Sequence, residues 1–265
     1  MEVGIFGLGR FGSFWSASLA HSFSVRAYDI DSGRPTPEGV RKTDLAGLAE
    51  CDTIFLCVTI RSMPEVLRLL SGVLKTGTLV VDTCSVKIEP ARWMAEILPE
   101  GIDILATHPM FGPESAKNGM EGLPLMMEPI RCDKERTAFW TKVFSDFGIS
   151  VVRMSCDRHD REAAYSQALT HFVGRSLHRV GLTDTDIATR WYKNLHAVVR
   201  QCVRDAPSLF EDMQRYNPYA AEMRRRVMLA FHDTIEDVEQ RPFQRTQADL
   251  DEGGVAPVNS VQGAD

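Results

Sequence analysis

Three closely spaced glycines near the start of the chain constrain its fold more than any other feature. They stand in Gly7-Leu8-Gly9-Arg10-Phe11-Gly12, directly after the apolar run 3–6 and at the start of the helical pattern 11–21. In a strand–turn–helix of this kind, the first glycine permits the tight turn, the second lets the backbone approach a pyrophosphate, and the third lets the helix pack closely on the strand. The pyrophosphate then meets free N–H groups at the helix N-terminus. Glycine-rich turns are common, so this motif needs support from its surroundings.

An acid at the end of the next apolar run gives that support. Asp29 follows the run 24–28, roughly 20 residues beyond the glycines, where an acid binds the ribose hydroxyls. A carboxylate there repels a 2′-phosphate, so the sequence predicts NAD rather than NADP as the cofactor. The alternative is that Asp29 and Asp31 form a solvated turn. Arg26 and Arg34 also lie near enough to weaken the preference for NAD.

Short apolar runs alternate with helical patterns through the first half of the chain. The expected strands cover residues 3–6, 24–28, 53–58, 78–81, 102–106 and 148–154, with helices over 11–21 and 64–74. Such alternation predicts an α/β Rossmann fold, a parallel sheet covered on both faces by helices. Val58 and Thr59 end the third expected strand, where such folds pack against the nicotinamide side of the cofactor.

The pattern changes near residue 155. Beyond it, helices are predicted over residues 161–180, 186–203, 208–214 and 220–238, with Ser155 and Asp157 as candidate N-caps of the first one. We therefore expect an NAD-binding Rossmann domain over residues 1–154 and an all-α domain for substrate binding and dimerisation over residues 155–242. Residues 243–265 are polar and without periodicity, and are expected to form a disordered tail.

The composition excludes several classes of function. The 265 residues carry a net charge of −6, without the basic stripe that nucleic-acid binding requires. No apolar run approaches the ~20 residues of a membrane span, and the N-terminus lacks the pattern of a signal peptide. The six cysteines are scattered, show no metal-ligand spacing and suit a reducing compartment. We expect a cytoplasmic protein with no metal, membrane or nucleic-acid partner.

A histidine follows one of the expected strands almost directly. His108 comes after the run 102–106, so it should lie at the carboxyl end of the sheet, where open α/β sheets bind ligands. An imidazole, with its usual pKa of about 6.5, can accept a hydroxyl proton while a hydride leaves the same carbon. The alternative is a loop histidine that hydrogen-bonds to the backbone, in a loop made rigid by Pro109 and Pro113.

The residues around His108 resemble a known family. Segment 108–119, His-Pro-Met-Phe-Gly-Pro-Glu-Ser-Ala-Lys-Asn-Gly, is similar to the signature of prephenate/arogenate dehydrogenases, especially their plant arogenate branch. The similarity continues in segments 82–87, 122–124, 154–160 and 166–175, and spans roughly residues 1–235. Several unlinked motifs carry it, so it is far more specific than the glycine turn alone.

The resemblance implies roles for residues in these motifs. His108 would bind and deprotonate the hydroxyl of a cyclohexadienol ring, and Ser85 would orient the imidazole and contact the same hydroxyl. As a bare sequence feature, Ser85 is a candidate helix N-cap. Glu114 is either a polar gate near the substrate or a surface acid.

An anionic substrate requires cations or neutral donors in its pocket. Thr170, His171 and Arg175 lie on the first expected helix of the second domain, and the last two are four residues apart on one face. Their partner is either a substrate carboxylate, as the resemblance implies for His171, or an acidic side chain between the domains. His159 and His178 look like ordinary exposed or capping histidines.

The resemblance weakens over residues 190–207. Some bacterial relatives hold the substrate side chain with an arginine in this region, and Arg200 is the nearest equivalent here. Plant arogenate enzymes have an acid at about this place, which suits an amino group. Arg200 and Gln201 stand there instead, a departure that leans toward prephenate.

The resemblance therefore implies an NAD-dependent oxidative decarboxylation in tyrosine biosynthesis, of prephenate to 4-hydroxyphenylpyruvate or of arogenate to tyrosine. One alternative is a dehydrogenase for an amino-substituted prephenate analogue in specialised metabolism. Another is a β-hydroxyacid dehydrogenase, which would carry a lysine where this chain has His171 and Arg175. A third is a non-catalytic dinucleotide-binding regulatory module, which would not need Ser85 and His108.

A homodimer is also expected, as in the family, because the helices of the second half carry apolar faces. The residues of these faces are Leu209, Phe210, Met213, Val227, Met228 and Phe231.

Overall fold

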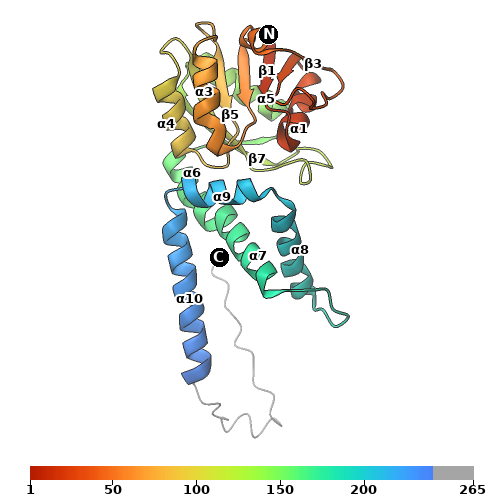
Figure 1. Cartoon of the computed structure of the whole chain (residues 1–265), viewed down its shortest axis with the longest axis vertical. Helices are drawn as coiled ribbons and strands as arrows, with labels where there is room; N and C mark the ends of the chain where they lie inside the picture. The colour runs from red at the N-terminus through yellow and green to blue at the C-terminus, as the bar shows by residue number, and fades with distance from the viewer. Residues whose placement is uncertain (241–265) are drawn as a thin grey trace. The chain divides into compact units, whose positions relative to one another are not determined.

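An eight-stranded sheet organises the computed structural model, which describes residues 1–240 (Figure 1). The strand order is β3-β2-β1-β4-β5-β6-β7-β8. Six strands are parallel: β1 (Glu2–Phe6), β2 (Ser24–Tyr28), β3 (Val40–Lys42), β4 (Thr53–Leu56), β5 (Leu79–Asp82) and β6 (Asp103–Pro109). β7 (Pro124–Arg131) runs antiparallel to β6, and β8 (Ser150–Arg153) runs parallel to β7.

The last two strands differ from the expected all-parallel sheet. Residues 148–154 do supply the final strand, but β8 pairs with β7 and so points opposite to the central strands. β7 itself was not predicted, since Pro124 and Pro129 interrupt its apolar pattern and proline cannot donate to a strand ladder. The register between β6 and β7 shifts at Pro129, and this irregularity accommodates the N–H donor that proline lacks.

Side chains from alternate positions of the buried strands form two apolar layers. In β4, Phe55 packs with Trp15 of α1 (Arg10–Ala20) and Trp140 of α5 (Lys134–Asp146). Its neighbours Ile54 and Leu56 face the opposite layer. That layer is covered by α2 (Leu45–Ala49), α3 (Met63–Ser71) and α4 (Ile88–Ile97). Each fully buried apolar side chain contributes about 1.5–3 kcal/mol, so both layers stabilise the sheet that carries the site.

The second half of the described chain is helical, as predicted. Its helices are α6 (Cys156–Ala163), α7 (Leu169–Val180), α8 (Arg190–Arg204), α9 (Pro207–Tyr216) and α10 (Ala220–Gln240). Ser155 caps α6 as expected, since its Oγ accepts from Arg158 N–H at 3.2 Å. A π-helical turn at Ala164–Ala168 divides the single helix that was expected over residues 161–180. The predicted fold class, a Rossmann domain followed by helices, is confirmed.

Within the described residues the chain divides into two compact units, residues 1–223 and residues 224–240. The first holds the sheet and helices α1 to α9. The expected domain boundary at residues 154 and 155 stays a prediction, and the expected tail over residues 243–265 lies outside the described residues.

Candidate active site

The glycine turn between β1 and α1 has the geometry that a dinucleotide requires. Gly7 has a φ of +102°, which glycine adopts freely, and its N–H donates to Tyr28 O at 2.8 Å. A Cβ on Gly12 would lie 1.8 Å from the carbonyl oxygen of Gly7, whereas Gly9 faces open space. Helix and turn therefore pack as closely as only glycine allows, and the backbone at Gly9 is accessible to a pyrophosphate. The turn, completed by Leu8, Arg10 and Phe11, fits a nicotinamide dinucleotide, NAD or NADP.

Asp29 lies beside this turn, at the end of β2. Its Oδ2 accepts a hydrogen bond from Leu8 N–H at 2.6 Å, and its Oδ1 accepts one from Asp31 N–H at 2.9 Å. Two backbone groups thus fix the carboxylate where the ribose hydroxyls are expected. The neighbouring arginines are paired with other carboxylates, Arg26 with the glutamate at the start of β1 and Arg34 with Asp31 at 3.5 Å.

A cavity of about 820 Å³ opens at the carboxyl ends of the central strands. Its walls are the glycine turn, the residues after β4 and β5, the end of β6 with the loop after it, and parts of α7, α8 and α9. This volume is in the range of small-molecule sites. The predicted site residues on its walls are Gly9, Arg10, Phe11, Val58, Thr59, Ser85, His108, Glu114 and His171.

His108 stands in β6, and only 3% of its surface is exposed. Its Nδ1 lies 2.8 Å from Nε2 of His159, whose Nδ1 lies 2.8 Å from Oδ1 of Asp160. The Asp160 carboxylate accepts hydrogen bonds from the N–H groups of Lys87 and Ile88 at 2.7 and 2.9 Å. The prediction that His159 is an exposed or capping histidine is wrong, because α6 packs against α4 and buries the ring.

Burial lowers the pKa of His108 well below its usual 6.5, and the neighbouring His159 and Lys87 lower it further. The ring is therefore neutral at physiological pH and free to accept a proton. Burial also lowers the pKa of His171, with a smaller lowering by Arg175 that Asp205 opposes.

A buried lysine connects the ends of strands β5 and β6 next to His108. Lys87 is fully buried, and its Nζ donates to Asp82 and to the carbonyl oxygen of Thr107. Asp82 also accepts hydrogen bonds from the N–H groups of Thr107 and Cys84 at 3.2 and 3.1 Å. A buried ion pair adds little net stability but is costly to break on one side, by about 3–5 kcal/mol. The pair holds the backbone next to His108 in place.

Ser85 lies on the cavity wall without the hydrogen bond that was expected of it. Its buried Oγ has no hydrogen-bond partner among residues 1–240, so it does not orient the imidazole of His108. It is not a helix N-cap either, since α4 begins at Ile88 with Lys87 at the N-cap position. An unpartnered hydroxyl at a cavity is available to a ligand.

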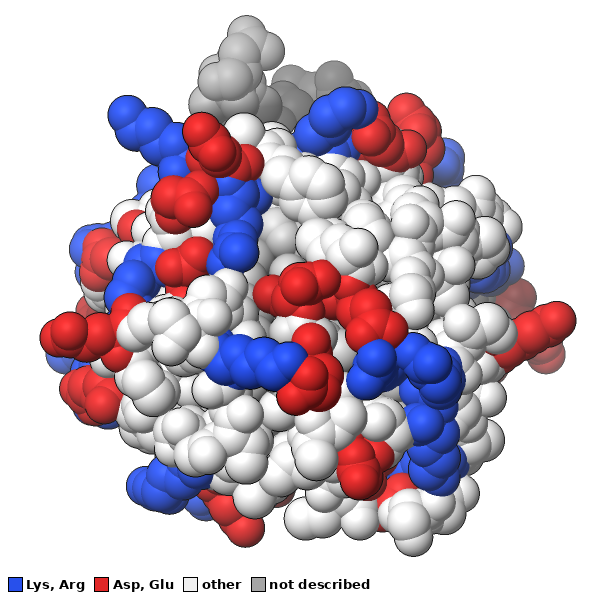
Figure 2. All heavy atoms as spheres, turned by 90° about the horizontal axis from the view of Figure 1, so that it is seen from above, with Lys and Arg blue, Asp and Glu red and all other residues white. Residues whose placement is uncertain are grey.

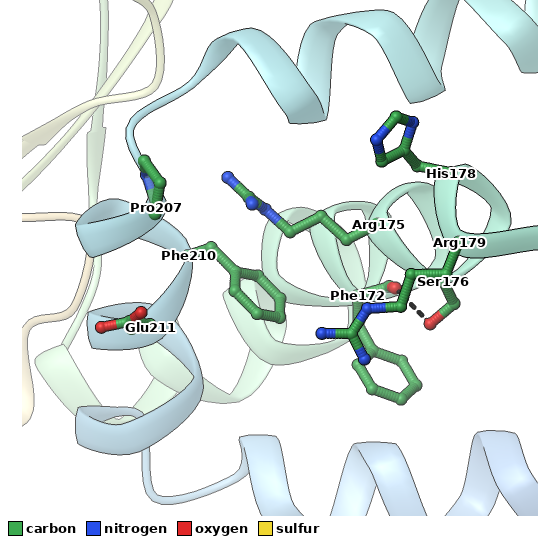
Figure 3. Close-up of a pocket in the computed structure, with 8 residues that line it drawn as sticks. All are labelled: Phe172, Arg175, Ser176, His178, Arg179, Pro207, Phe210 and Glu211. Atoms are coloured by element: carbon green, nitrogen blue, oxygen red, sulfur yellow. Dashed lines mark hydrogen bonds between the residues drawn. The ribbon is translucent and has the colours of Figure 1, made fainter. Parts of the chain in front are cut away.

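His171 and Arg175 project from one face of α7, as their spacing predicts, but they line different cavities. His171 lies at the large cavity, with its Nε2 3.7 Å from Oδ2 of Asp205. Arg175 lines a second cavity of about 280 Å³ between α7 and α9, where Figure 3 shows it pointing toward Phe210 and Pro207. Its Cζ lies 4.9 Å from the centre of the Phe210 ring, and its Nη2 donates to the carbonyl oxygen of Asp205 at 3.0 Å.

Asp205 is the acidic side chain that the sequence predicts, without identifying it, as the alternative partner of His171. It follows α8, lines the large cavity and lies between His171 and Arg10, whose Nη1 is 3.8 Å from its Oδ1. Glu114 is on the same wall, 3.6 Å from Nη2 of Arg10, with an exposed side chain. Gln167, in the π-helical turn, is a further wall residue that was not predicted. No local sequence pattern marks Asp205 or Gln167 as a cavity residue, because the junction after α8 positions Asp205 and the π-helical turn positions Gln167.

Thr170 and Arg200 are not brought to either cavity. Thr170 is exposed, and its hydroxyl donates to Ser166 O at 2.8 Å within the helix. Arg200 has 52% of its side chain exposed and lies 3.7 Å from Asp184. Its neighbour Gln201 lines the large cavity instead, because one helical step of about 100° turns Arg200 away.

Known proteins resemble this chain along most of its length. The nucleotide-binding domain of prephenate dehydrogenase matches residues 32–151, and a TYRAAT1-like C-terminal domain matches residues 176–250. The chain is 33% identical to arogenate dehydrogenase 2, chloroplastic, of Arabidopsis thaliana, over 98% of this chain and 81% of that protein. It belongs to the prephenate/arogenate dehydrogenase family. Arogenate dehydrogenase 1, chloroplastic, of the same plant is 35% identical over 92% of this chain and 40% of its own length.

Solved structures agree with this family assignment at the level of the fold. A prephenate dehydrogenase from A. aeolicus, in complex with hydroxyphenyl propionate and NAD⁺, has a TM-score of 0.69 at 21% identity, over 91% of this chain and 90% of that one. Synechocystis arogenate dehydrogenase has a TM-score of 0.65 at 22% identity, over 96% of this chain and all of that one (100%). The family expected from segment 108–119 is thus confirmed.

A membrane-spanning helix, a metal site and a charged surface patch each require particular features of the described residues. Within residues 1–240, no helix has both the length and the apolar character to cross a membrane, and no three His, Cys, Asp or Glu side chains are grouped to hold a metal ion. On the face drawn in Figure 2, basic and acidic side chains are interspersed.

Proposed function

We propose that this protein oxidises and decarboxylates arogenate to tyrosine with NAD as the hydride acceptor. One observation carries the proposal: His108, a buried base with a lowered pKa, shares a cavity wall with the dinucleotide turn. Oxidation of an alcohol by a nicotinamide requires this combination, since the hydroxyl proton must leave as the hydride does.

In this mechanism His108 is the general base. It accepts the proton of the ring hydroxyl while the carbinol carbon loses its hydride, and the hydroxyl of Ser85 binds the same oxygen. NAD supplies the hydride acceptor when it is bound by residues 7–12 and Asp29, with Val58 and Thr59 against the nicotinamide. Loss of the ring carboxylate as carbon dioxide yields an aromatic ring, which makes the reaction effectively irreversible.

Asp205 favours arogenate over prephenate. Arogenate has an ammonium group where prephenate has a keto oxygen, and a carboxylate on the cavity wall attracts the first and offers nothing to the second. Arg10 and His171, at 3.8 and 3.7 Å from Asp205, supply cationic or donor groups for the substrate carboxylates. The sequence leans toward prephenate because Arg200 and Gln201 stand where plant arogenate enzymes have an acid; of these two, Gln201 lines the cavity and Arg200 does not, and Asp205 places an acid on that wall.

A homodimer is part of this proposal. The apolar residues of α9 are used within the chain, because Met213 is buried while Leu209 and Phe210, both partly buried, line the two cavities. Met228 and Phe231 of α10 are 59% and 52% exposed and remain candidates for the contact, joined by Ile187, just before α8, and Trp191, in its first turn, which are 90% and 79% exposed. Light scattering should give twice the chain mass, and the variant Trp191→Asp should shift the equilibrium toward the monomer. A monomeric wild type at high concentration would disprove the dimer.

We also propose the cytoplasm as the compartment, because all six cysteines are free thiols and suit a reducing environment. The Arabidopsis relatives are described as chloroplastic, so fractionation of the source cells is the test. Protein found only in another compartment would contradict this part.

A substrate and cofactor matrix tests the proposed reaction. Purified protein is given arogenate, prephenate or an amino-substituted prephenate analogue, each with NAD and with NADP, and reduced cofactor and carbon dioxide are measured. We expect the highest kcat/KM for arogenate with NAD, and a reduced preference for arogenate in Asp205→Asn. Asp184→Asn is the matched control, because Asp184 is exposed and lines neither cavity. Turnover of prephenate alone would overturn the substrate, and no turnover of any substrate would overturn the function.

A further inference from the structure

Three buried side chains form a continuous hydrogen-bonded row that ends at the proposed base. His108, His159 and Asp160 are 3%, 3% and 0% exposed. Each ring–ring or ring–carboxylate contact in the row is 2.8 Å long. The row leads away from the cavity, since His159 and Asp160 are not on its walls. Neither residue is needed to bind substrate or cofactor, so their arrangement calls for another role.

The direction of each hydrogen bond follows from the fixed end of the row. Two backbone donors, the N–H groups of Lys87 and Ile88, point at the Asp160 carboxylate, which can therefore only accept. Nδ1 of His159 must then carry a hydrogen and donate it to Oδ1 of Asp160. With one hydrogen on each ring, Nε2 of His159 is an acceptor, and Nδ1 of His108 donates to it. The remaining nitrogen of His108, Nε2, has a free lone pair.

We propose that His159 and Asp160 are positioning residues that hold His108 in the tautomer with an unprotonated Nε2, the only one that can take a proton from the substrate. This inference rests on the proposed function and adds two residues to its machinery. In the opposite tautomer, Nε2 of His108 would already carry a hydrogen and the ring could not act as a base.

The row also allows the positive charge that His108 gains with the proton to move to His159. When the substrate O–H bond breaks, an N–H bond forms at Nε2 of His108. The hydrogen on Nδ1 of His108 can then move to Nε2 of His159, which leaves His108 neutral and His159 cationic. That cation lies directly against the Asp160 carboxylate, at 2.8 Å. Proton count and charge balance, because one hydrogen enters the row and one positive charge results.

Lys87 and Asp82 fix the positions of both ends of this row of side chains. Lys87 provides a backbone N–H to Asp160, while its Nζ donates to the carbonyl oxygen of Thr107, the residue before His108. Asp82 completes this clamp by accepting from Lys87 Nζ and from Thr107 N–H. The charged and titratable groups around His108 and His159 are therefore Asp160 from α6, Lys87 at the N-cap of α4 and Asp82 at the end of β5.

A pair of substitutions at His159 separates positioning from simple packing. His159→Gln keeps an amide oxygen that can accept from His108 Nδ1–H, whereas His159→Phe fills similar space without an acceptor. We expect kcat to fall by about 10²-fold in His159→Phe and by less than about tenfold in His159→Gln, with KM little changed in both. His21→Gln, at an exposed histidine, is the control and should leave kcat and KM unchanged. Equal kcat in the Phe and Gln variants would overturn the proposal.

Nitrogen NMR of the wild-type protein gives a readout that does not depend on activity or on these variants folding. In protein labelled with ¹⁵N-histidine and without cofactor, His108 should show hydrogen on Nδ1 and none on Nε2 near neutral pH; its signals are assigned by their loss in His108→Asn. A hydrogen on Nε2 of His108 would overturn the proposal even in an active enzyme. An inactive wild type with the expected tautomer would instead count against the proposed function alone.

Discussion

At the scale of the residue, burial sets the chemistry of the two histidines at the cavity. Burial is the largest cause of the lowered pKa of both His108 and His171. The neighbouring groups then act on the two pKa values in opposite directions. His159 and Lys87 lower the pKa of His108 further, whereas the Asp205 carboxylate raises the pKa of His171. His108 is thereby suited to accept a proton, and His171 to donate a ring N–H hydrogen bond to an anionic ligand.

The charge of Asp29 should set the choice of cofactor. We expect kcat/KM with NAD to exceed that with NADP by at least about tenfold, a difference of about 1.4 kcal/mol. Asp29→Ser should narrow this gap, because serine keeps a polar group beside Leu8 N–H and removes the repulsion of a 2′-phosphate. Asp31→Ser is the matched control, since Asp31 lies two residues away with an exposed side chain. Equal use of NAD and NADP by the wild type would refute this role of Asp29.

At the scale of the element, local motifs could be predicted and packing between elements could not. The glycine turn and the position of His108 depend on one strand and the residues after it, so the sequence was sufficient for both. The burial of His159 depends on α6 packing against α4, and the position of Asp205 depends on the junction of α8 and α9. β7 was missed because Pro124 and Pro129 obscure its pattern.

Helix α7 provides a direct comparison of the two cavities. His171→Ala should raise KM for the substrate by about tenfold with little change in kcat, because its contact with the substrate is present in ground and transition states alike. Arg175→Ala, in contrast, should lower Tm by about 2–4 °C, since this variant loses the cation–π contact with Phe210 and the hydrogen bond to Asp205 O. A fall in kcat alone for His171→Ala would show that it acts on the chemical step instead.

At the scale of the whole molecule, the buried histidines couple stability to pH. The folded pKa of His108 and of His171 is lower than the usual 6.5, so the unfolded chain binds more protons below that pH. The free energy of unfolding should therefore fall as pH decreases from about 6.5 toward the lowered values. The pKa values of Glu2, Asp157 and Glu211 are also lowered, but from usual values of 4.5, 3.8 and 4.5, so their effect begins in a more acidic range.

Urea denaturation between about pH 8 and pH 5 measures this coupling. We expect a steady loss of stability below about pH 6.5 in the wild type and a shallower loss in His108→Asn, which has no proton to bind at that position. Stability that is constant or rises over this interval would contradict the burial of His108 as the main cause of its low pKa.

The turnover number of His108→Asn with arogenate and NAD tests the central claim most directly. Asparagine can still hydrogen-bond to the ring hydroxyl but cannot accept its proton. The account predicts a kcat lower by about 10²–10⁴-fold, with KM within about threefold of the wild type, because the base contributes mainly in the transition state. A kcat close to that of the wild type would contradict it and require another base in the cavity, of which His171 is the first candidate.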